Sequence, residues 1–478
     1  MGKSIVAPFA WRQSLPSFMQ QVNLGLIGGG TVGGGVFAAV RRNGPLMTSR
    51  LGVRLRIARV AVRDLKKRRA VPIPRPLLTT DWRAVVRDPR IHLILELMGG
   101  TTVARQVVLA ALQLGKPVVT ANKALLSAHG EELFEAAQRY GTNLYYEASV
   151  AGGIPIIKVL REGLIGNRIT RLYGIVNGTC NYILTRMKLE GADFADVLAD
   201  AQRLGYAETP PDLDIDGHDA AHKTGILASL AHGFWVNPQH IYVEGIRHIT
   251  KLDMQFAELL GYTIKLLGIV KKAEGISDLR STIYEGGGDG GPARKSKIEN
   301  RKSAIQVSVY PTLVPDTQVL ASVNGVFNAI YVRGDIVGDT LYYGRGAGQD
   351  ATASAVLADL ADAALDLKCG TRNRIPPFVP HERDGTVLPL EEVISRYYVR
   401  LNVVDKPGVF AKIAAVLAQA DIGISSIVQP EGHAGETVPV ILMIHDATNA
   451  AMRQALEKIA RLPVVKGVPV MIRVENFQ

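Results

Sequence analysis

Short apolar runs alternate with longer amphipathic segments in the first part of the chain. The runs have the length of buried strands and lie at residues 22–27, 55–62, 91–98, 117–120 and 143–147. Helical spacing of apolar positions begins near Val36 and recurs over Ala104–Leu114. Such alternation predicts a parallel sheet with right-handed crossovers. We therefore expect an α/β, doubly wound sheet of the Rossmann type over residues 22–150.

The middle of the chain has a less regular pattern, in which strand-like segments precede and follow an apolar helix that starts at Asp219. This mixture predicts an α+β domain for catalysis and dimerisation over residues 151–340. The alanine-rich segment Ala351–Leu365 is strongly helical. We assign residues 341–370 to a helical segment that returns to the first domain and packs on it.

The end of the chain predicts a third domain. Tyr397–Val403 alternates as a strand does, and Phe410–Asp421 is an amphipathic helix. Two strands, a helix and a last strand follow, and this βαββαβ order is typical of a ferredoxin-like domain, here residues 395–478. Residues 371–394, rich in proline and arginine, are predicted to link it to the preceding segment.

Two segments stand outside these domains. Residues 1–21 contain no acidic residue and are interpreted as a flexible extension. A true start at Met19 is an alternative, and so is a transit peptide, although transit peptides are normally richer in arginine. Residues 285–302 read EGGGDGGPARKSKIENRK, and their glycines and charges predict a flexible surface insertion.

Composition narrows the class of protein. The 478 residues exceed what one hydrophobic core holds, and 47% hydrophobic with 21% charged residues is typical of globular domains. Two cysteines cannot form a disulfide framework, so we expect a reducing, cytoplasmic location. No apolar run reaches the roughly 18 residues of a membrane span. The net charge of +11 is scattered and no nucleic-acid-binding module is present, so we expect neither nucleic acid nor membrane as a partner.

A glycine-rich motif joins the first strand to the first helix, where Gly28, Gly30 and Gly33 have the G-x-G-x-x-G spacing. Glycines at this place let the backbone turn sharply and approach a pyrophosphate at the helix N-terminus. We predict that this motif binds a dinucleotide cofactor, with Thr31 and Val32 among the contacts.

The end of the second strand bears on the choice of cofactor. Asp64 would bind the ribose 2′-hydroxyl of NAD, whereas Arg63 would bind the 2′-phosphate of NADP. The basic run Lys66–Arg69 follows, so we predict a preference for NADP, with NAD as the alternative. A solvated basic turn would also account for the run.

Other candidate cofactor contacts follow from the sheet, because ligands bind at the carboxyl ends of parallel strands. Thr102 and Lys123 each follow such a strand, although a solvated loop lysine is the alternative for Lys123. Gly348 belongs to a second glycine-rich turn that precedes a helix and is positioned to meet phosphates or nicotinamide.

The stretch LGYAETPPDLDIDGHDAAHK is the strongest candidate for the chemistry. Asp219 and Lys223 lie one helical turn apart in the order that favours an ion pair, and apolar residues next to them indicate a core. An exposed surface pair has the same spacing. Asp212, Asp214 and Asp216 match the start of a calcium loop, but a lysine stands where the glutamate ligand belongs, which argues against calcium. Upstream, Cys180 has no evident histidine base, so a buried, unreactive thiol is expected there.

Over residues 22–478 the chain resembles homoserine dehydrogenases. The collinear matching stretches are GLIGGGTVGGGV, ELMGGT, VVTANKALLS, YEASVAGGIPII, NGTCNYIL, LGYAE, DIDGHDAAHK, ASVNGVFNAI and YGRGAG. The C-terminal part is similar to small amino-acid-sensing domains of the ACT type, through DKPGVFAKIAAVLA. Such a collinear set is more specific than any single motif.

This resemblance implies the reversible reduction of L-aspartate 4-semialdehyde to L-homoserine in threonine, methionine and isoleucine biosynthesis. It implies that Lys223 exchanges a proton with the reacting oxygen and that Lys123 lies between nicotinamide and substrate. Glu208 is implied to hold the substrate amino group, while Asp219 and Asp214 hold or orient the substrate and the lysines.

The resemblance also implies Gly205 as a cofactor contact and a monovalent cation, sodium. The cation would bind the Glu147 carboxylate and the backbone carbonyls of Val150, Gly152 and Ile154. These carbonyls come from alternate residues, as carbonyls on one side of an extended segment would.

An effector and an oligomer are implied as well. Threonine is expected at the ACT-type domain, near the turn Asp405–Gly408, although an assembly module without an effector is the alternative for this domain. The chain is expected to form a homodimer or homotetramer. The chain departs from the family pattern in the insertion at 285–302 and in Val103, where the family commonly has proline. Neither departure touches a matched catalytic position.

Two rival functions stay open on the sequence. One is a dehydrogenase of the same sheet type that acts on another aldehyde or hydroxy acid. The other is a catalytically inactive protein that senses nucleotides and amino acids. Retention of the implied catalytic residues argues against the sensor, namely Lys123, Glu208, Asp219 and Lys223.

Overall fold

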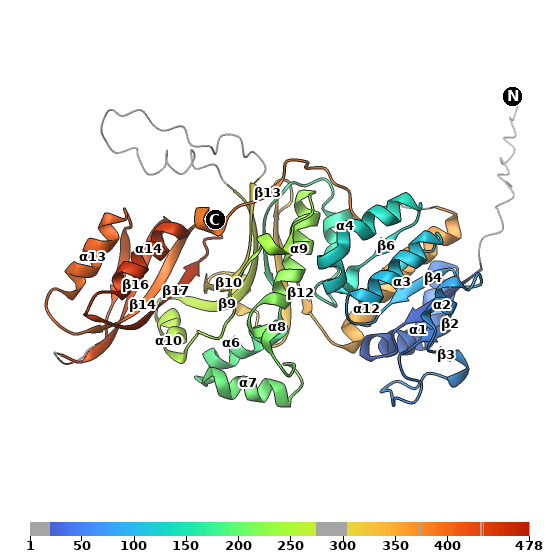
Figure 1. Cartoon of the computed structure of the whole chain (residues 1–478), viewed down its shortest axis with the longest axis horizontal. Helices are drawn as coiled ribbons and strands as arrows, with labels where there is room; N and C mark the ends of the chain where they lie inside the picture. Colours follow the sequence, from blue (N-terminus) through green and yellow to red (C-terminus); the bar gives the residue numbers. More distant parts are fainter. Residues whose placement is uncertain (1–19, 274–303, 372–373, 431–432, 434, 478) are drawn as a thin grey trace, which may run out of the picture.

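The structure is a computed structural model that describes residues 20–273, 304–371, 374–430, 433 and 435–477. Figure 1 shows three bodies in a row: a sheet with its helices at one end, a second sheet in the middle, and the C-terminal domain at the other end. The predicted insertion lies outside the described residues, as does the predicted extension up to residue 19. Gln21, the last residue of that predicted extension, is the first residue of strand β1.

The first sheet is parallel throughout and has the order β3-β2-β1-β4-β5-β6. Its strands are β1 (Gln21–Ile27), β2 (Arg54–Ala61), β3 (Leu78–Thr79), β4 (Leu93–Glu96), β5 (Val118–Thr120) and β6 (Leu144–Tyr145). The order reverses between β1 and β4, so the carboxyl ends of these strands form the crevice in which such sheets bind dinucleotides. The predicted Rossmann-type sheet is confirmed.

Helices cover both faces of this sheet (Figure 1). They are α1 (Thr31–Leu51), α2 (Trp82–Arg87), α3 (Thr102–Gln113), α4 (Lys123–Arg139) and α12 (Gln349–Cys369). The alanine-rich helix α12 comes from much later in the chain and packs on α1. A Cβ atom at Gly35 of α1 would lie 2.6 Å from Cγ of Gln349, so only glycine permits this close approach. Small residues thus let α12 enter the core of the first domain.

The second sheet is antiparallel in the part that precedes the C-terminal domain, with the order β12-β11-β7-β9-β10. Its strands are β7 (Ile169–Ile175), β9 (Tyr262–Lys272), β10 (Ala304–Pro315), β11 (Phe327–Gly334) and β12 (Gly338–Arg345). The helices of this region are α6 (Gly178–Glu190), α7 (Phe194–Arg203), α8 (Asp212–Ile215), α9 (His218–His232) and α10 (Lys251–Leu259). Strand β12 runs past the predicted domain boundary at residue 340.

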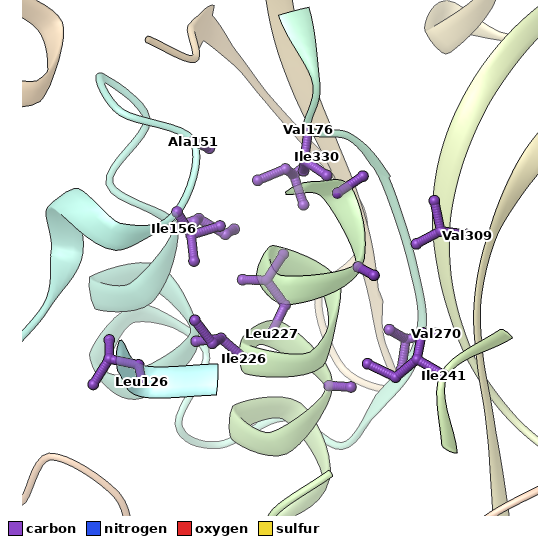
Figure 2. Close-up of a cluster of buried hydrophobic side chains, with 14 of the residues drawn as sticks. Leu126, Ala151, Ile156, Val176, Ile226, Leu227, Ile241, Val270, Val309 and Ile330 are labelled. Atoms are coloured by element: carbon purple, nitrogen blue, oxygen red, sulfur yellow. The ribbon is translucent and has the colours of Figure 1, made fainter. Parts of the chain in front are cut away.

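Helix α9 packs between the first domain and the second sheet. Figure 2 shows Ile226 and Leu227 of α9 between Leu126 and Ile156 on one side and side chains of the second sheet, such as Val270, on the other. All of these side chains are buried. Since burial of apolar surface is the main favourable term in folding, this packing fixes the rotation of α9 and hence the direction of its polar side chains.

The C-terminal domain has the predicted βαββαβ order. Its elements are β14 (Ile394–Val404), α13 (Val409–Gln419), β15 (Ile424–Val428), β16 (Thr437–Thr448), α14 (Asn449–Ala460) and β17 (Val465–Val474). The sheet order β17-β14-β16-β15 is that of a ferredoxin-like fold. Strand β17 also pairs in parallel with β10, through Thr312 with Arg473 and Leu313 with Val474, so the two sheets form one continuous sheet.

Buried ion pairs cross this junction. Arg473, 1% exposed, donates to Glu244 Oε2 at 3.0 Å, and Arg400 Nε donates to Asp253 Oδ1 at 2.7 Å. The guanidinium of Arg473 also lies over the ring of Tyr310, 4.4 Å from its centroid. Removing one partner of such a pair leaves a buried charge without compensation. These contacts join the C-terminal domain to the middle domain.

The predicted linker is packed against both domains. Tyr146 donates its hydroxyl to the carbonyl of Pro377 at 2.6 Å, and Phe378 packs on the rings of Phe134 and Trp235. Farther along, strand β13 (Thr386–Val387) pairs with β10. The segment thus runs as an attached strap from the first domain to the second sheet.

Candidate active site

The glycine motif has the geometry of a nucleotide-binding turn. Gly28 has φ of +108°, a conformation that side chains rarely adopt, and a Cβ atom there would collide with the carbonyl oxygen of Leu97. A Cβ atom at Gly33 would collide with the carbonyl oxygen of Gly28. Nothing lies within 4 Å of the Cβ position of Gly30, so a pyrophosphate has room beside this backbone.

Helix α1 starts directly at this turn with Thr31 and Val32. Gly30 is its N-cap, no side chain caps it, and its first turn has no acidic residue. The amides at the start of a helix point outward and carry partial positive charge, so they are suited to hold phosphate oxygens. Thr102 occupies the equivalent place in α3, as its first residue after β4.

The basic loop after β2 folds back toward the glycine turn. Lys66 donates its amide to Oδ1 of Asp64 at 2.7 Å, and Arg69 donates its guanidinium to the carbonyl of Asp64. The Cβ position of Gly29 lies 3.3 Å from Nε of Arg69. Arg63 is exposed at the same edge. The sequence did not single out Arg69 within its basic run, because only the folded loop brings it to the glycine turn.

Two lysines from different domains meet at one buried carboxylate. Lys223 of α9 donates to Oδ2 of Asp219 and to the carbonyl of Val176, both at 2.7 Å. Lys123, the first residue of α4, forms an ion pair with Oδ1 of the same Asp219. Asp219 and Lys223 are each 8% exposed, which rules out the solvated surface pair. This cluster joins α4 of the first domain to α9 of the middle domain.

Burial and charge tune these groups in opposite directions. Burial lowers the pKa of Lys223 and outweighs the opposing effect of Asp219, while the positive charge of Lys123 lowers it further. Burial works against ionisation of Asp219, but Lys223 and Lys123 together hold its pKa below the usual range. The site therefore keeps a carboxylate beside an amine that gives up its proton more readily than an exposed lysine.

Asn177 connects the lysine cluster to the acidic loop, and sequence reasoning missed it. Its Nδ2 donates to Oδ2 of Asp219 at 3.0 Å and to Oδ1 of Asp214 at 2.9 Å, while its Oδ1 caps α6 by accepting from the amide of Cys180 at 2.8 Å. Burial raises the pKa of Asp214 against the effect of Asn177. The available signal was the polar turn after a strand, which places an amide at the carboxyl end of β7.

The remaining residues of the acidic stretch lie at its edge. Glu208 is exposed, and its carbonyl accepts from Gln202 at 3.2 Å. Gly205 has φ of +76°, with nothing within 4 Å of its Cβ position. Thr179 donates to the carbonyl of Tyr206, which holds this loop close to α6. The open sides of Gly205 and Glu208 leave space for ligands.

The calcium alternative is not supported. Arg247 forms ion pairs with both Asp212 and Asp216, and Asp214 bonds to Asn177. Residues 212–215 form helix α8. No group of three metal-binding side chains occurs in the part of the chain that the structure describes.

Cys180 is also settled as a structural residue. It is fully buried, and burial raises the pKa of its thiol well above the ordinary value. Its Sγ lies 3.2 Å from the carbonyl oxygen of Asp214. A thiol held in this protonated state is a poor nucleophile.

The turn predicted to hold a cation is tightly folded. Both oxygens of the buried Glu147 carboxylate accept backbone amides, from Ile157 at 2.9 Å and Lys158 at 2.7 Å. Burial nevertheless raises the pKa of Glu147 to about 7. Ile154 accepts from the amide of Ile156 at 2.8 Å. No hydrogen bond within the described residues reaches the carbonyl oxygens of Val150 or Gly152, which are free to accept a cation.

The second glycine-rich turn lies against this turn. Gly153 donates its amide to the carbonyl of Arg345 at 2.9 Å, and a Cβ atom at Gly152 would lie 2.5 Å from the carbonyl oxygen of Gly346. Gly348, with φ of +117° and open space around it, is the N-cap of α12. The sequence identified both turns, but only the fold brings them into contact.

The chain is similar to proteins of one family over most of its length. The family model described as "Homoserine dehydrogenase, NAD binding domain" matches residues 28–147, and the one described as "Homoserine dehydrogenase" matches residues 155–361. A homoserine dehydrogenase of Pseudomonas aeruginosa is 42% identical over 466 residues, which cover 96% of this chain and 100% of that protein.

Solved structures point the same way. A homoserine dehydrogenase from Thiobacillus denitrificans superposes with a TM-score of 0.85 at 43% identity, over 96% of this chain and 99% of that one. A hyperthermophilic archaeal homoserine dehydrogenase in complex with NADPH has a TM-score of 0.57 at 25% identity, over 72% of this chain and 98% of that one. None of the helices in the described ranges is both long and apolar enough to cross a membrane.

Proposed function

The chain belongs to the homoserine dehydrogenase family, and on that premise we propose how its residues interconvert L-aspartate 4-semialdehyde and L-homoserine. The observation that carries the proposal is the buried Lys223–Asp219–Lys123 cluster, which spans the cofactor crevice and the catalytic domain. A sensor without catalysis would not require two lysines at one buried carboxylate, so this alternative is not favoured. The direct test is the rate of cofactor reduction with homoserine as substrate.

Lys223 is the proton-exchanging group. In the oxidising direction a hydride leaves the substrate carbon and the hydroxyl proton passes to the neutral amine of Lys223. In the reducing direction the lysine ammonium returns that proton to the oxygen. When bound, the nicotinamide cofactor supplies or accepts the hydride. A buried amine with a lowered pKa is suited to this exchange, because it gives up its proton more readily than an exposed lysine.

The neighbouring charges orient the reactants. Lys123 lies between the cofactor crevice and Lys223, and its charge stabilises negative charge that develops on the reacting oxygen. Asp219 fixes both lysines. Asp214 orients the substrate through the same network, and the exposed Glu208 binds the substrate ammonium.

The cofactor site combines the glycine turn with contacts from later elements. The pyrophosphate lies at the start of α1, the nicotinamide end extends toward Lys123, and the 2′-phosphate meets the basic loop. The residues assigned to it are Gly28, Gly30, Thr31, Val32, Gly33, Arg63, Thr102, Lys123, Gly205 and Gly348. NADP is therefore proposed as the preferred cofactor, with NAD as the weaker one.

Replacing Arg63 by alanine is expected to reduce the preference for NADP over NAD by about 10- to 150-fold, because a charged hydrogen bond is worth about 1.5–3 kcal/mol. The measurement is the ratio of kcat/KM for the two cofactors. Arg54→Ala is the matched control, since Arg54 is an exposed arginine at the opposite end of β2. An unchanged ratio in Arg63→Ala would assign the 2′-phosphate to another residue, with Arg69 the next candidate.

Sodium is proposed on Glu147 and the carbonyls of Val150, Gly152 and Ile154. Its support is a buried carboxylate without a lysine or arginine ion-pair partner among the described residues, next to carbonyls free to accept a cation. Monovalent cations prefer such oxygen ligands, so the cation would hold the turn against the second glycine-rich turn. Exchanging Na⁺ for tetramethylammonium is expected to lower both activity and melting temperature, with recovery when Na⁺ is added. Equal behaviour in both buffers would remove the cation from the proposal.

Threonine is proposed as an inhibitory effector at the C-terminal domain, which is taken to be of the ACT type. Gly408 has φ of +85° with open space around it, and no side chain caps α13, so a carboxylate can approach the helix amides. We also propose a homodimer or homotetramer, because Ile336 and Tyr343 are large apolar residues exposed on β12 and its hairpin turn. Light scattering of the purified protein measures this oligomeric state directly.

Ala411→Glu tests the effector site without removing a domain. Removing the C-terminal domain is unsuitable, because it would remove β17, which pairs with β10. It would also leave Glu244 and Asp253 without their arginine partners. A glutamate at this exposed position in the first turn of α13 favours the helix but repels the effector carboxylate. We expect threonine inhibition of about 5- to 150-fold in the native chain, its loss in Ala411→Glu, and its retention in Ala411→Gln. Inhibition retained by Ala411→Glu would place the effector elsewhere.

A further inference from the structure

Glu96 is a fully buried carboxyl group that no step described so far uses. It is the last residue of β4, at the strand end where the order of the parallel sheet reverses, and it is 0% exposed. The groups that bond to it are neutral: Thr120 donates its hydroxyl to Oε2 at 2.6 Å, and the amide of Met98 donates to Oε1 at 3.0 Å. A buried carboxyl group without a cationic partner is costly and is seldom kept for stability alone.

The hydrogen bonds of Glu96 lead to Asn122, the residue that precedes Lys123. The Thr120 hydroxyl accepts the amide of Asn122 at 3.0 Å, so its own proton is directed to Glu96. Asn122 in turn caps α4 by accepting from the amide of Leu125, and its Nδ2 donates to the carbonyl of Gly100 at 2.8 Å. Lys123 is the next residue along the chain. The carboxyl ends of β4 and β5 are thus tied together immediately before this lysine.

We infer that Glu96 is a positioning residue, which acts through the Thr120 hydroxyl to hold the turn that places Lys123 against Asp219. This inference rests on the proposed roles of Lys123 and Lys223. Both oxygens of Glu96 act as acceptors. A glutamine at this position would therefore place an NH₂ group against either the Met98 amide or the Thr120 hydroxyl. The hydrogen bonds stabilise the negative charge of Glu96 only in part, since burial raises its pKa to about 7.

Displacement of Lys123 has a specific consequence for Lys223. The positive charge of Lys123 is one of the causes that lower the pKa of Lys223, so moving it away raises that pKa. Oxidation of homoserine requires the neutral amine, and its rate should then rise with pH at a higher pH than in the native chain. The other titratable groups that face Lys223 stay in place, namely Asp219 and His222 of α9, Asp214 of α8 and Cys180 of α6.

The test compares Thr120→Val, Thr120→Ser and Glu96→Gln in the full chain. Thr120→Val keeps the shape of the side chain and removes the hydroxyl, and Thr120→Ser keeps the hydroxyl. We expect kcat to fall about 10- to 100-fold in Thr120→Val and Glu96→Gln, because small displacements of reacting groups have effects of this size. In Thr120→Val and Glu96→Gln, the pH profile of the oxidation rate should shift to higher pH. Cofactor affinity, measured by fluorescence titration, should stay within about twofold of the native value. Thr120→Ser should retain the native rate and profile.

The outcomes separate this inference from the proposed function. A native chain without homoserine dehydrogenase activity would overturn the proposed function itself. An active native chain, with Thr120→Val and Glu96→Gln folded and unchanged in kcat and pH profile, would overturn the inference alone. A lower melting temperature with an unchanged pH profile would also overturn it, since that result describes a structural role only. If Glu96→Gln fails to fold, the pair Thr120→Val and Thr120→Ser still decides.

Discussion

Replacing Lys223 by methionine is expected to lower kcat by roughly 10²–10⁴-fold in both directions, while the affinity for the cofactor stays within about twofold. General acid–base groups make contributions of this size. Methionine fills most of the buried volume, so loss of packing contributes little. Asp219 also keeps Lys123 as its partner, and no carboxylate is left uncompensated. Steady-state rates in both directions and a fluorescence titration of the cofactor measure the two effects.

Lys116→Met is a suitable control for this variant. The Lys116 ammonium also donates to main-chain carbonyls, those of Val86 and Asp88. Lys116 precedes β5, at the amino ends of the parallel strands, whereas the crevice lies at their carboxyl ends. The Lys116→Met variant should therefore have a normal rate. Near-native rates in Lys223→Met would remove this lysine from the proton exchange and leave Lys123 as the remaining candidate.

The parts of the fold that the sequence predicted are those governed by local pattern. The strand, the glycine motif and the helix that starts at Thr31 are consecutive in the sequence. Steric constraints on the backbone require glycine in the motif, so this unit could be predicted. The pair Asp219–Lys223 lies within one helix, so its contact follows from helical geometry. The glycine motif and the Asp219–Lys223 pair could be predicted because the residues of each lie close together in the sequence.

Local pattern alone does not predict contacts between elements, and the role of Asp219 toward both lysines was implied only by the family resemblance. Lys123 meets Asp219 only because α9 packs between α4 and the second sheet, and this packing depends on many buried side chains at once. Asn177 and Glu96 act through hydrogen bonds to other elements, so the sequence places each of them at the end of a strand but does not identify the partners. The parallel pairing of β10 with β17 could not be predicted either, because the order of strands depends on the whole sheet.

Replacing Asp219 by asparagine is expected to damage both activity and stability. Asparagine keeps the shape of the side chain but removes the only carboxylate that bonds both lysines among the described residues. Breaking a buried ion pair costs about 3–5 kcal/mol. We expect a value near the lower end, about 3 kcal/mol at pH 7, because the Lys123 side chain is 39% exposed and water screens part of its charge. Turnover should fall at least about 100-fold, since neither lysine keeps its position.

The pH dependence of this loss has a defined sign. The lysines hold the pKa of Asp219 below its usual range, so its contribution to stability is fully present above the unfolded-state value, about 3.9, and is lost as the pH falls below that value. The difference in urea midpoint between the native chain and Asp219→Asn should therefore be constant from about pH 7 to 5 and should narrow below about pH 4. Asp216→Asn is the matched control, because the side chain of its partner Arg247 is 47% exposed, and a surface pair of this kind is worth about 0–1 kcal/mol. Equal midpoints for Asp219→Asn and the native chain at pH 7 would show that the two lysines do not depend on this carboxylate.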